Sequence, residues 1–110
     1  MRILVLFMLL ASALGAQAQD YRRYISKSVM PLSDLLLKKQ FLVISDPPTC
    51  KTNALMRGYF ISRYRAIYLC VDNLLKDPRL GDINGRNKLN DVRKQLSTTL
   101  THEAIHVAQW

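Results

Sequence analysis

The chain has 110 residues, of which 49% are hydrophobic and 22% are charged, with 16 Lys and Arg against 8 Asp and Glu. This length excludes a multidomain protein and a large catalytic fold such as a TIM barrel, because one domain typically needs about 100–200 residues. The composition is that of a globular protein, and it excludes disorder, collagen and a coiled coil.

The first 18 residues have the three parts of a secretory signal peptide. Met1-Arg2 is a positive start, residues 3–14 are almost unbroken apolar sequence, and Ala16-Gln17-Ala18 is an A-x-A cleavage site. The run is shorter than the ~20 residues that a membrane span needs. We therefore expect cleavage after Ala18, a mature domain over 19–110 and a secreted or periplasmic protein; an uncleaved anchor and a buried helix are the alternatives.

The first part of the mature chain has helical spacing. Apolar residues over Asp20–Val29 favour a first helix, and Pro31 fits the start of a second helix over Leu32–Gln40. Phe41–Ile44 is a short apolar run that fits a buried strand or a helix end, and the Ser-Asp-Pro-Pro sequence after it breaks the pattern.

A β-hairpin is predicted next. Residues 57–61 are aromatic and β-branched, Ser62–Arg65 can form the turn, and Ala66–Val71 is a second strand with apolar residues on both faces.

Export also affects how Cys50 and Cys70 are interpreted, since an oxidising compartment favours a disulfide between these two cysteines. Such a disulfide is worth about 3 kcal/mol in the chain-entropy model. A reactive or metal-binding thiol pair is the alternative.

From about Asn87 the pattern is helical to the end of the chain. Apolar residues recur at helical steps, and the Ser-Thr-Thr-Leu-Thr sequence at 97–101 is less helix-prone, which allows a bend or break there. We expect Leu100 and Ile105 to pack into the core while His102, Glu103 and His106 face a cleft. The patterns together predict an α+β fold with N-terminal helices, a short hairpin and a long C-terminal helix.

The two His and the single Glu of the chain all fall in one motif, His102-Glu103-Ala104-Ile105-His106. Residues four apart on a helix share a face, so His102 and His106 can bind one tetrahedral Zn²⁺. Glu103 is then placed to act as general base on water whose pKa the metal lowers. A surface His pair with a solvated Glu, and a metal site without catalysis, are the alternatives.

The stretch Thr98–His106 resembles the active-site helix of zincin metallopeptidases. The order of a Cys-bearing strand before a Leu-Thr-His-Glu helix is similar to the mitochondrial intermembrane-space metalloprotease family, over about Arg57–Gln109. The resemblance implies that His102 and His106 are zinc ligands and that Glu103 is the catalytic base. It also implies that Ala66–Val71 is an edge strand along the cleft, where an extended peptide binds by strand addition.

A catalytic zinc needs a third protein ligand, which in zincins usually follows the motif helix. Asp72, Asp91 and Cys70 are weak candidates, and the extended metzincin pattern is absent because Gln109 stands at its Gly position. The helical pattern reaches Trp110 without a stop signal. We therefore expect a partial zincin-like domain, the N-terminal portion of a longer protein.

The predicted function is that of an exported zinc-dependent metallopeptidase with a peptide or protein substrate. Metal-dependent hydrolysis of another bond remains open. The alternative is a small non-enzymatic secreted protein that binds an acidic partner or a membrane surface, because the formal net charge is +8. The basic pairs Arg22-Arg23, Lys38-Lys39 and Arg63/Arg65 are spread along the chain, and without a known motif they do not predict a nucleic-acid interface.

Overall fold

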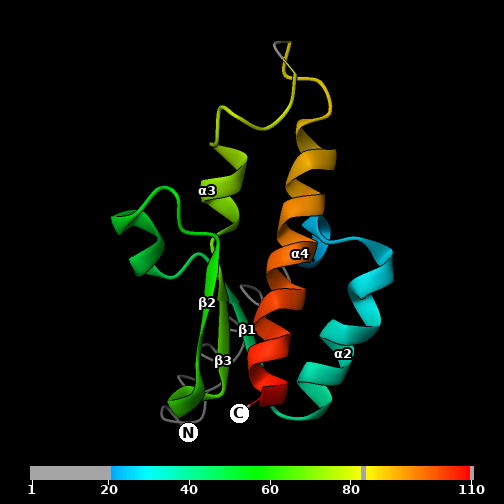
Figure 1. The fold of residues 1–110 in the computed structure, drawn as a ribbon, viewed down its shortest axis with the longest axis vertical. Helices are drawn as coiled ribbons and strands as arrows, with labels where there is room; N and C mark the ends of the chain where they lie inside the picture. Colours follow the sequence, from blue (N-terminus) through cyan, green and yellow to red (C-terminus); the bar gives the residue numbers. More distant parts are fainter. Residues whose placement is uncertain (1–20, 83, 110) are drawn as a thin grey trace, which may run out of the picture.

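The computed structural model describes residues 21–82 and 84–109. They form the predicted α+β fold with a long C-terminal helix, α4, which lies beside a sheet (Figure 1). The sheet has three strands and is mixed, which was not predicted. The predicted signal peptide, residues 1–18, lies outside the described residues. The helices are α2 (Met30–Lys38), α3 (Val71–Leu75) and α4 (Lys88–Gln109), and the strands are β1 (Leu42–Ser45), β2 (Gly58–Ile61) and β3 (Ala66–Leu69).

The prediction of a first helix is wrong. Instead of one helix over Asp20–Val29, the chain forms two short 3₁₀ helices, η1 (Tyr21–Tyr24) and η2 (Lys27–Val29). Ser26 between them is extended, and its N–H donates to the Ser97 hydroxyl of α4 at 2.8 Å. A tertiary hydrogen bond therefore overrides the local helical preference here. By contrast, α2 forms as expected, with Pro31 in its first turn and Leu36 in the core.

The sheet has the order β1-β3-β2, with β1 parallel and β2 antiparallel to β3. The hairpin is confirmed, and Arg65 closes its turn in the left-handed conformation with φ of 49°. The predicted edge position of Ala66–Val71 is wrong, because β3 is the central strand and β2 is an edge. The strand also ends at Leu69, and Val71 begins α3. A strand with apolar residues on both faces is stable only when both faces are covered.

The long helix α4 is continuous over 22 residues. The hydroxyls of Thr98, Thr99 and Thr101 each donate to a backbone carbonyl one turn earlier, at 2.9 Å, and this segment is helical without a break. Val92, Leu96 and Leu100 of the helix are fully buried in the core, and the helix contacts α3, β2 and β3. No helix in the described part of the chain is long and apolar enough to span a membrane.

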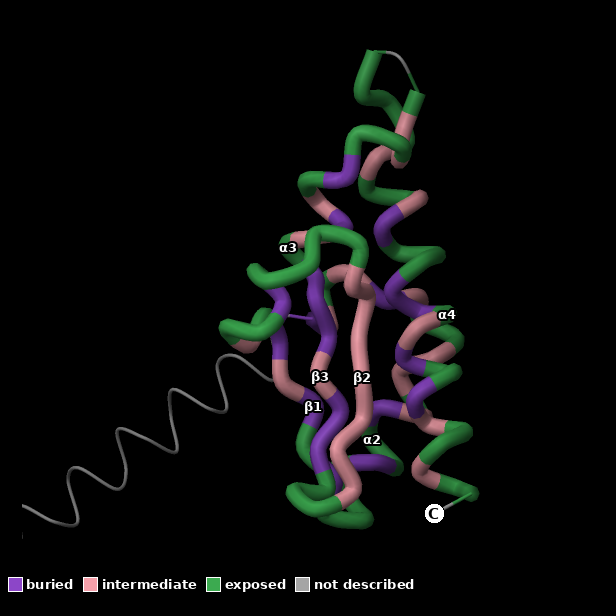
Figure 2. The backbone as a smooth tube through the Cα atoms, turned by 60° about the vertical axis from the view of Figure 1, so that its left-hand side comes forward, coloured by how far each residue is buried: buried purple, intermediate pink, exposed green. Residues whose placement is uncertain are grey.

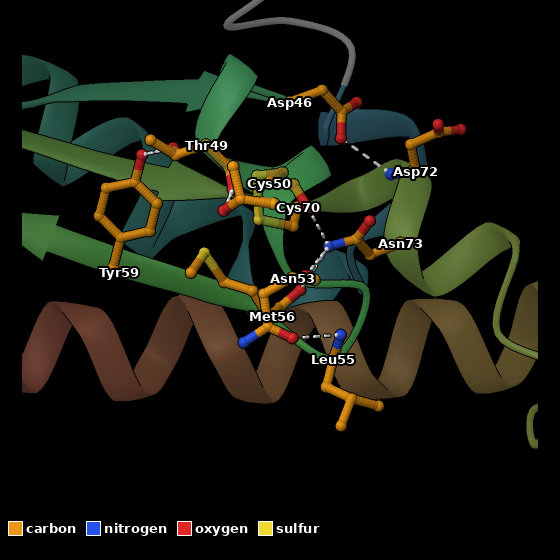
Figure 3. Close-up of a disulfide and its surroundings, with 11 residues drawn as sticks. Asp46, Thr49, Cys50, Asn53, Leu55, Met56, Tyr59, Cys70, Asp72 and Asn73 are labelled. Carbon is orange, nitrogen blue, oxygen red and sulfur yellow. Dashed lines mark hydrogen bonds between the residues drawn. A yellow bond between two sulfur atoms is a disulfide. The ribbon is translucent and has the colours of Figure 1, made fainter.

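The predicted disulfide joins Cys50 and Cys70. It ties the 3₁₀ helix η3 (Pro48–Thr52) to the residue that follows β3 (Figure 3). The Asn73 side-chain amide nitrogen donates to the carbonyls of Cys50, Asn53 and Met56, each at 3.0 Å. The disulfide and this amide together fix the loop that leads into β2.

Candidate metal centre

The two histidines of the motif meet on one exposed side of α4. His102 and His106 are one turn apart, and their Nε2 atoms lie 3.1 Å from each other. Both side chains are exposed, whereas Glu103 is only 6% exposed. Ligand atoms of the three residues all lie within 4.8 Å of one another.

This spacing fits a tetrahedral zinc ion. Two nitrogens that are each about 2.0–2.1 Å from one tetrahedral zinc are about 3.3 Å apart, close to the observed separation. The same 3.1 Å also fits a hydrogen bond between two neutral imidazoles. In the metal site both Nε2 atoms carry a lone pair, whereas in the hydrogen bond one Nε2 carries the proton. The donor chemistry therefore suits a transition metal such as zinc, and a metal-binding experiment separates the two.

Helical geometry explains why the Glu turns inward. At about 100° per residue, Glu103 lies about 60° from the buried Leu100 around the helix axis. Ile105 lies about 140° from Leu100, and it is 51% exposed. The prediction that Ile105 packs into the core is therefore wrong, while that for Leu100 is confirmed.

A cleft of about 520 Å³ opens between α4 and the edge strand β2. Its lining includes Glu103 and His106 from the motif. The other lining residues are Gly58, Tyr59, Phe60, Ser62 and Gln109. His102 lines a separate hollow on the surface of α4, with Thr98, Thr101 and Ile105. The base candidate and one histidine thus share the cleft, and the Nε2 atom of the second histidine lies 3.1 Å from that of the first.

The backbone of β2 has an open edge beside this cleft. Cys70 N–H donates to the Arg57 carbonyl, and Tyr59 is in register with Tyr68. Because hydrogen-bonded pairs alternate along an antiparallel ladder, the N–H and C=O groups of Gly58 and Phe60 point away from β3. The N–H and C=O groups of Gly58 can pair with an extended chain laid along the cleft.

Gly58 allows β2 to approach α4 closely. A Cβ atom at this position would lie 2.9 Å from Thr99 Cγ2 and 2.7 Å from the Tyr68 carbonyl oxygen. Both separations are shorter than carbon side chains tolerate, so a larger residue would force the strand and helix apart. Thr99 is one turn before Glu103, and the contact therefore sets the width of the cleft at its end.

The structure brings none of the candidate third ligands to this site. Asp72 pairs with Lys76 at 2.9 Å, the Asp91 carboxylate accepts the Gly81 N–H at 2.7 Å, and Cys70 is in the disulfide. Within residues 21–82 and 84–109, the cluster of potential metal ligands consists of His102, Glu103 and His106.

An ion-pair cluster around the buried Asp77, next to β2, was not predicted. Asp77 accepts hydrogen bonds from Arg79 at 2.9 Å and from Arg57 at 2.6 Å. The Arg79 side chain and backbone N–H, and then Arg57, hold the pKa of the Asp77 carboxyl well below its usual range. The Arg79 N–H bond to Asp77 is an Asx turn, and the Asp-Pro pair at 77–78 was its only sequence signal. Arg57 directly precedes β2, so this cluster anchors the strand.

The fold and the site define a small disulfide-linked α+β domain that carries a His-Glu-His cluster on its last helix. The profile of a family described as a domain of unknown function, DUF8637, matches residues 21–110, and the chain belongs to this family. No curated protein matches the chain, and neither does any solved structure.

Proposed function

We propose that this protein is an exported zinc-dependent metallopeptidase of the zincin type. The observation that carries the proposal is the convergence of the His102 and His106 Nε2 atoms at 3.1 Å beside a cleft that Glu103 lines. The zincin resemblance of the motif and the oxidised Cys50–Cys70 pair, which suits an extracytoplasmic compartment, support it.

His102 and His106 would hold the metal through their Nε2 atoms. Zinc, when bound, acts as a Lewis acid and lowers the pKa of a coordinated water to near 7. The exposure of both imidazoles leaves the remaining coordination positions open to water, substrate or a further ligand.

Glu103 would act as the general base. Its carboxylate accepts a proton from the attacking water and returns it to the leaving amine, as a positioned carboxylate does in general acid–base catalysis. Packing of this part of α4 against the sheet supports the role, because a buried side chain holds one orientation.

The substrate would be an extended peptide added to the open edge of β2. The outward N–H and C=O groups of Gly58 supply main-chain hydrogen bonds for such strand addition. A peptide bound this way lies along the cleft that Glu103 and His106 line. In this proposal β2 is the edge strand that binds the substrate, a role that the resemblance to zincins implied for Ala66–Val71.

The test compares the purified protein loaded with zinc and the variant Glu103→Gln, using a mixture of unstructured peptides and mass spectrometry of the products. We expect cleavage by the parent and a loss of at least about a hundredfold in rate with the variant, which keeps the metal. Thr98→Ala, on the exposed side of the same helix, is the matched control and should cleave at the parental rate. Equal rates for Glu103→Gln and the parent would refute the mechanism.

A non-enzymatic basic secreted protein is the second candidate. It is favoured by the absence of a third ligand among the described residues. If the zinc-loaded parent cleaves no peptide while binding an anionic partner, this second candidate replaces the first.

A further inference from the structure

One end of the molecule is strongly basic. Lys38 and Lys39 lie at the end of α2, and Arg63 and Arg65 lie in the turn between β2 and β3. The structure brings these two pairs together, because Arg65 Nη2 donates to the Lys39 carbonyl at 2.9 Å. All four side chains are exposed, and both connections lie at the lower end of the molecule in Figure 2. We call these four residues the basic end.

The segments that build the basic end contain no acidic residue. Residues 35–45, 58–71 and 104–109 have no Asp or Glu. In another part of the fold, Asp77 pairs with Arg57 and Arg79. Two of the three basic pairs that are spread along the sequence are thus brought by the fold into one positive surface, which attracts anionic partners.

Apolar side chains are exposed among these cations. Leu42 is 45% exposed, and its N–H donates to the Arg65 carbonyl at 2.9 Å. Tyr64 is 59% exposed, and the Arg63 guanidinium lies 5.8 Å from its ring centroid. Exposed aliphatic and Tyr side chains interspersed with Lys and Arg are typical of surfaces that lie in the membrane interface.

An apolar groove of about 570 Å³ adjoins the basic end. It lies between α2 and the C-terminal turns of α4, on the side of α4 opposite to His102 and His106. The lining residues are Leu32, Leu35, Leu36, Lys39, Phe41, Arg65, Ala104, Val107 and Ala108. Two cations of the basic end thus stand beside apolar surface that is open to solvent.

We propose that the basic end docks on the surface of an anionic lipid bilayer. The four cations lie at the level of the headgroups, and Leu42 and Tyr64 enter the interface. Charge complementarity identifies the occupant as anionic, and the exposed apolar side chains favour a bilayer over an acidic protein, which would leave them without apolar contacts. This inference does not depend on the metal site or on its activity.

The experiment is co-sedimentation of the purified protein with vesicles of phosphatidylcholine, with and without phosphatidylserine. We expect binding to the anionic vesicles only, weakening as salt is raised. The triple variant Lys38→Gln, Lys39→Gln and Arg63→Gln should bind about 100-fold more weakly, since each cation near an anionic surface is worth about fivefold. It leaves Arg65 and its hydrogen bond in place.

The matched control removes the same charge elsewhere, with Arg86→Gln, Arg93→Gln and Lys94→Gln, three exposed positions on the loop before α4 and on its first turns. This control variant should bind the anionic vesicles less than tenfold more weakly than the parent. For the apolar contribution, Leu42→Ser should weaken binding severalfold, whereas Leu89→Ser, at a leucine of α4 that is 57% exposed, should not.

Three results would overturn the proposal. They are equal binding to neutral and anionic vesicles, equal losses in the two triple variants, and binding to polyglutamate without binding to anionic vesicles. The last result would identify an acidic protein as the partner. Circular dichroism of every variant separates loss of binding from loss of fold.

Discussion

Replacing Asn73 with Ala removes the side-chain amide that holds the loop before β2. In Figure 3 this amide points into the loop, and its nitrogen donates to the carbonyls of Cys50, Asn53 and Met56 at 3.0 Å each. An NH₂ group has two protons, so the three contacts amount to about two hydrogen bonds. At about 1 kcal/mol each, their loss should lower the free energy of unfolding by about 2 kcal/mol.

Urea denaturation followed by circular dichroism measures this loss, with the disulfide intact. The variant Asn73→Asp is the sharper control, since it has the same shape but would point a carboxylate at three carbonyl oxygens. We expect it to be less stable than Asn73→Ala at neutral pH. If Asn73→Ala costs less than about 0.5 kcal/mol, the typical effect of an ordinary surface substitution, the disulfide alone holds the loop and the reasoning is wrong.

Three further predictions concern the frame of the site. Gly58→Ala should destabilise the fold by about 1–3 kcal/mol in urea denaturation, because the new methyl group would overlap Tyr68 and Thr99; unchanged stability would contradict the close approach. Replacing Cys50 and Cys70 by Ala should cost about 3 kcal/mol in the same assay, and a cost near zero would show that the cross-link does not restrict the unfolded chain. Asp77 has a lowered pKa in the folded state, so its stabilisation is present above about pH 4 and is lost as the pH falls further. The stability difference between the parent and Asp77→Asn should therefore be constant near neutral pH and shrink in acid; a difference that grows in acid would refute the assignment.

The elements that could be predicted from the sequence are those with a local signal. The β2–β3 hairpin follows from two adjacent runs of β-forming residues, and α4 follows from its apolar spacing. The disulfide followed from there being two cysteines in a chain that we expect to be exported. The hairpin and the helix could thus be predicted from neighbouring residues, and the disulfide from the number of cysteines.

The elements that failed depend on contacts between distant segments. The parallel pairing of β1 with β3 joins residues 24 positions apart, such as Leu42 and Ala66, and no local pattern encodes it. This pairing moves β3 to the centre and makes β2 the edge beside the candidate site. The basic end escaped prediction for the same reason, since Lys39 and Arg65 meet only in the folded chain.

Zinc binding by the purified protein tests the central claim most directly. Chelator-competition titration should give one zinc per chain for the parent and for Glu103→Gln, because that variant keeps both imidazoles. His106→Ala and His102→Ala should each weaken zinc binding by about a hundredfold or more, since loss of even an outer-shell partner costs 10–100-fold. If the parent binds no zinc, or if both histidine variants bind it as tightly as the parent, the 3.1 Å contact is a hydrogen bond between imidazoles and not a metal site.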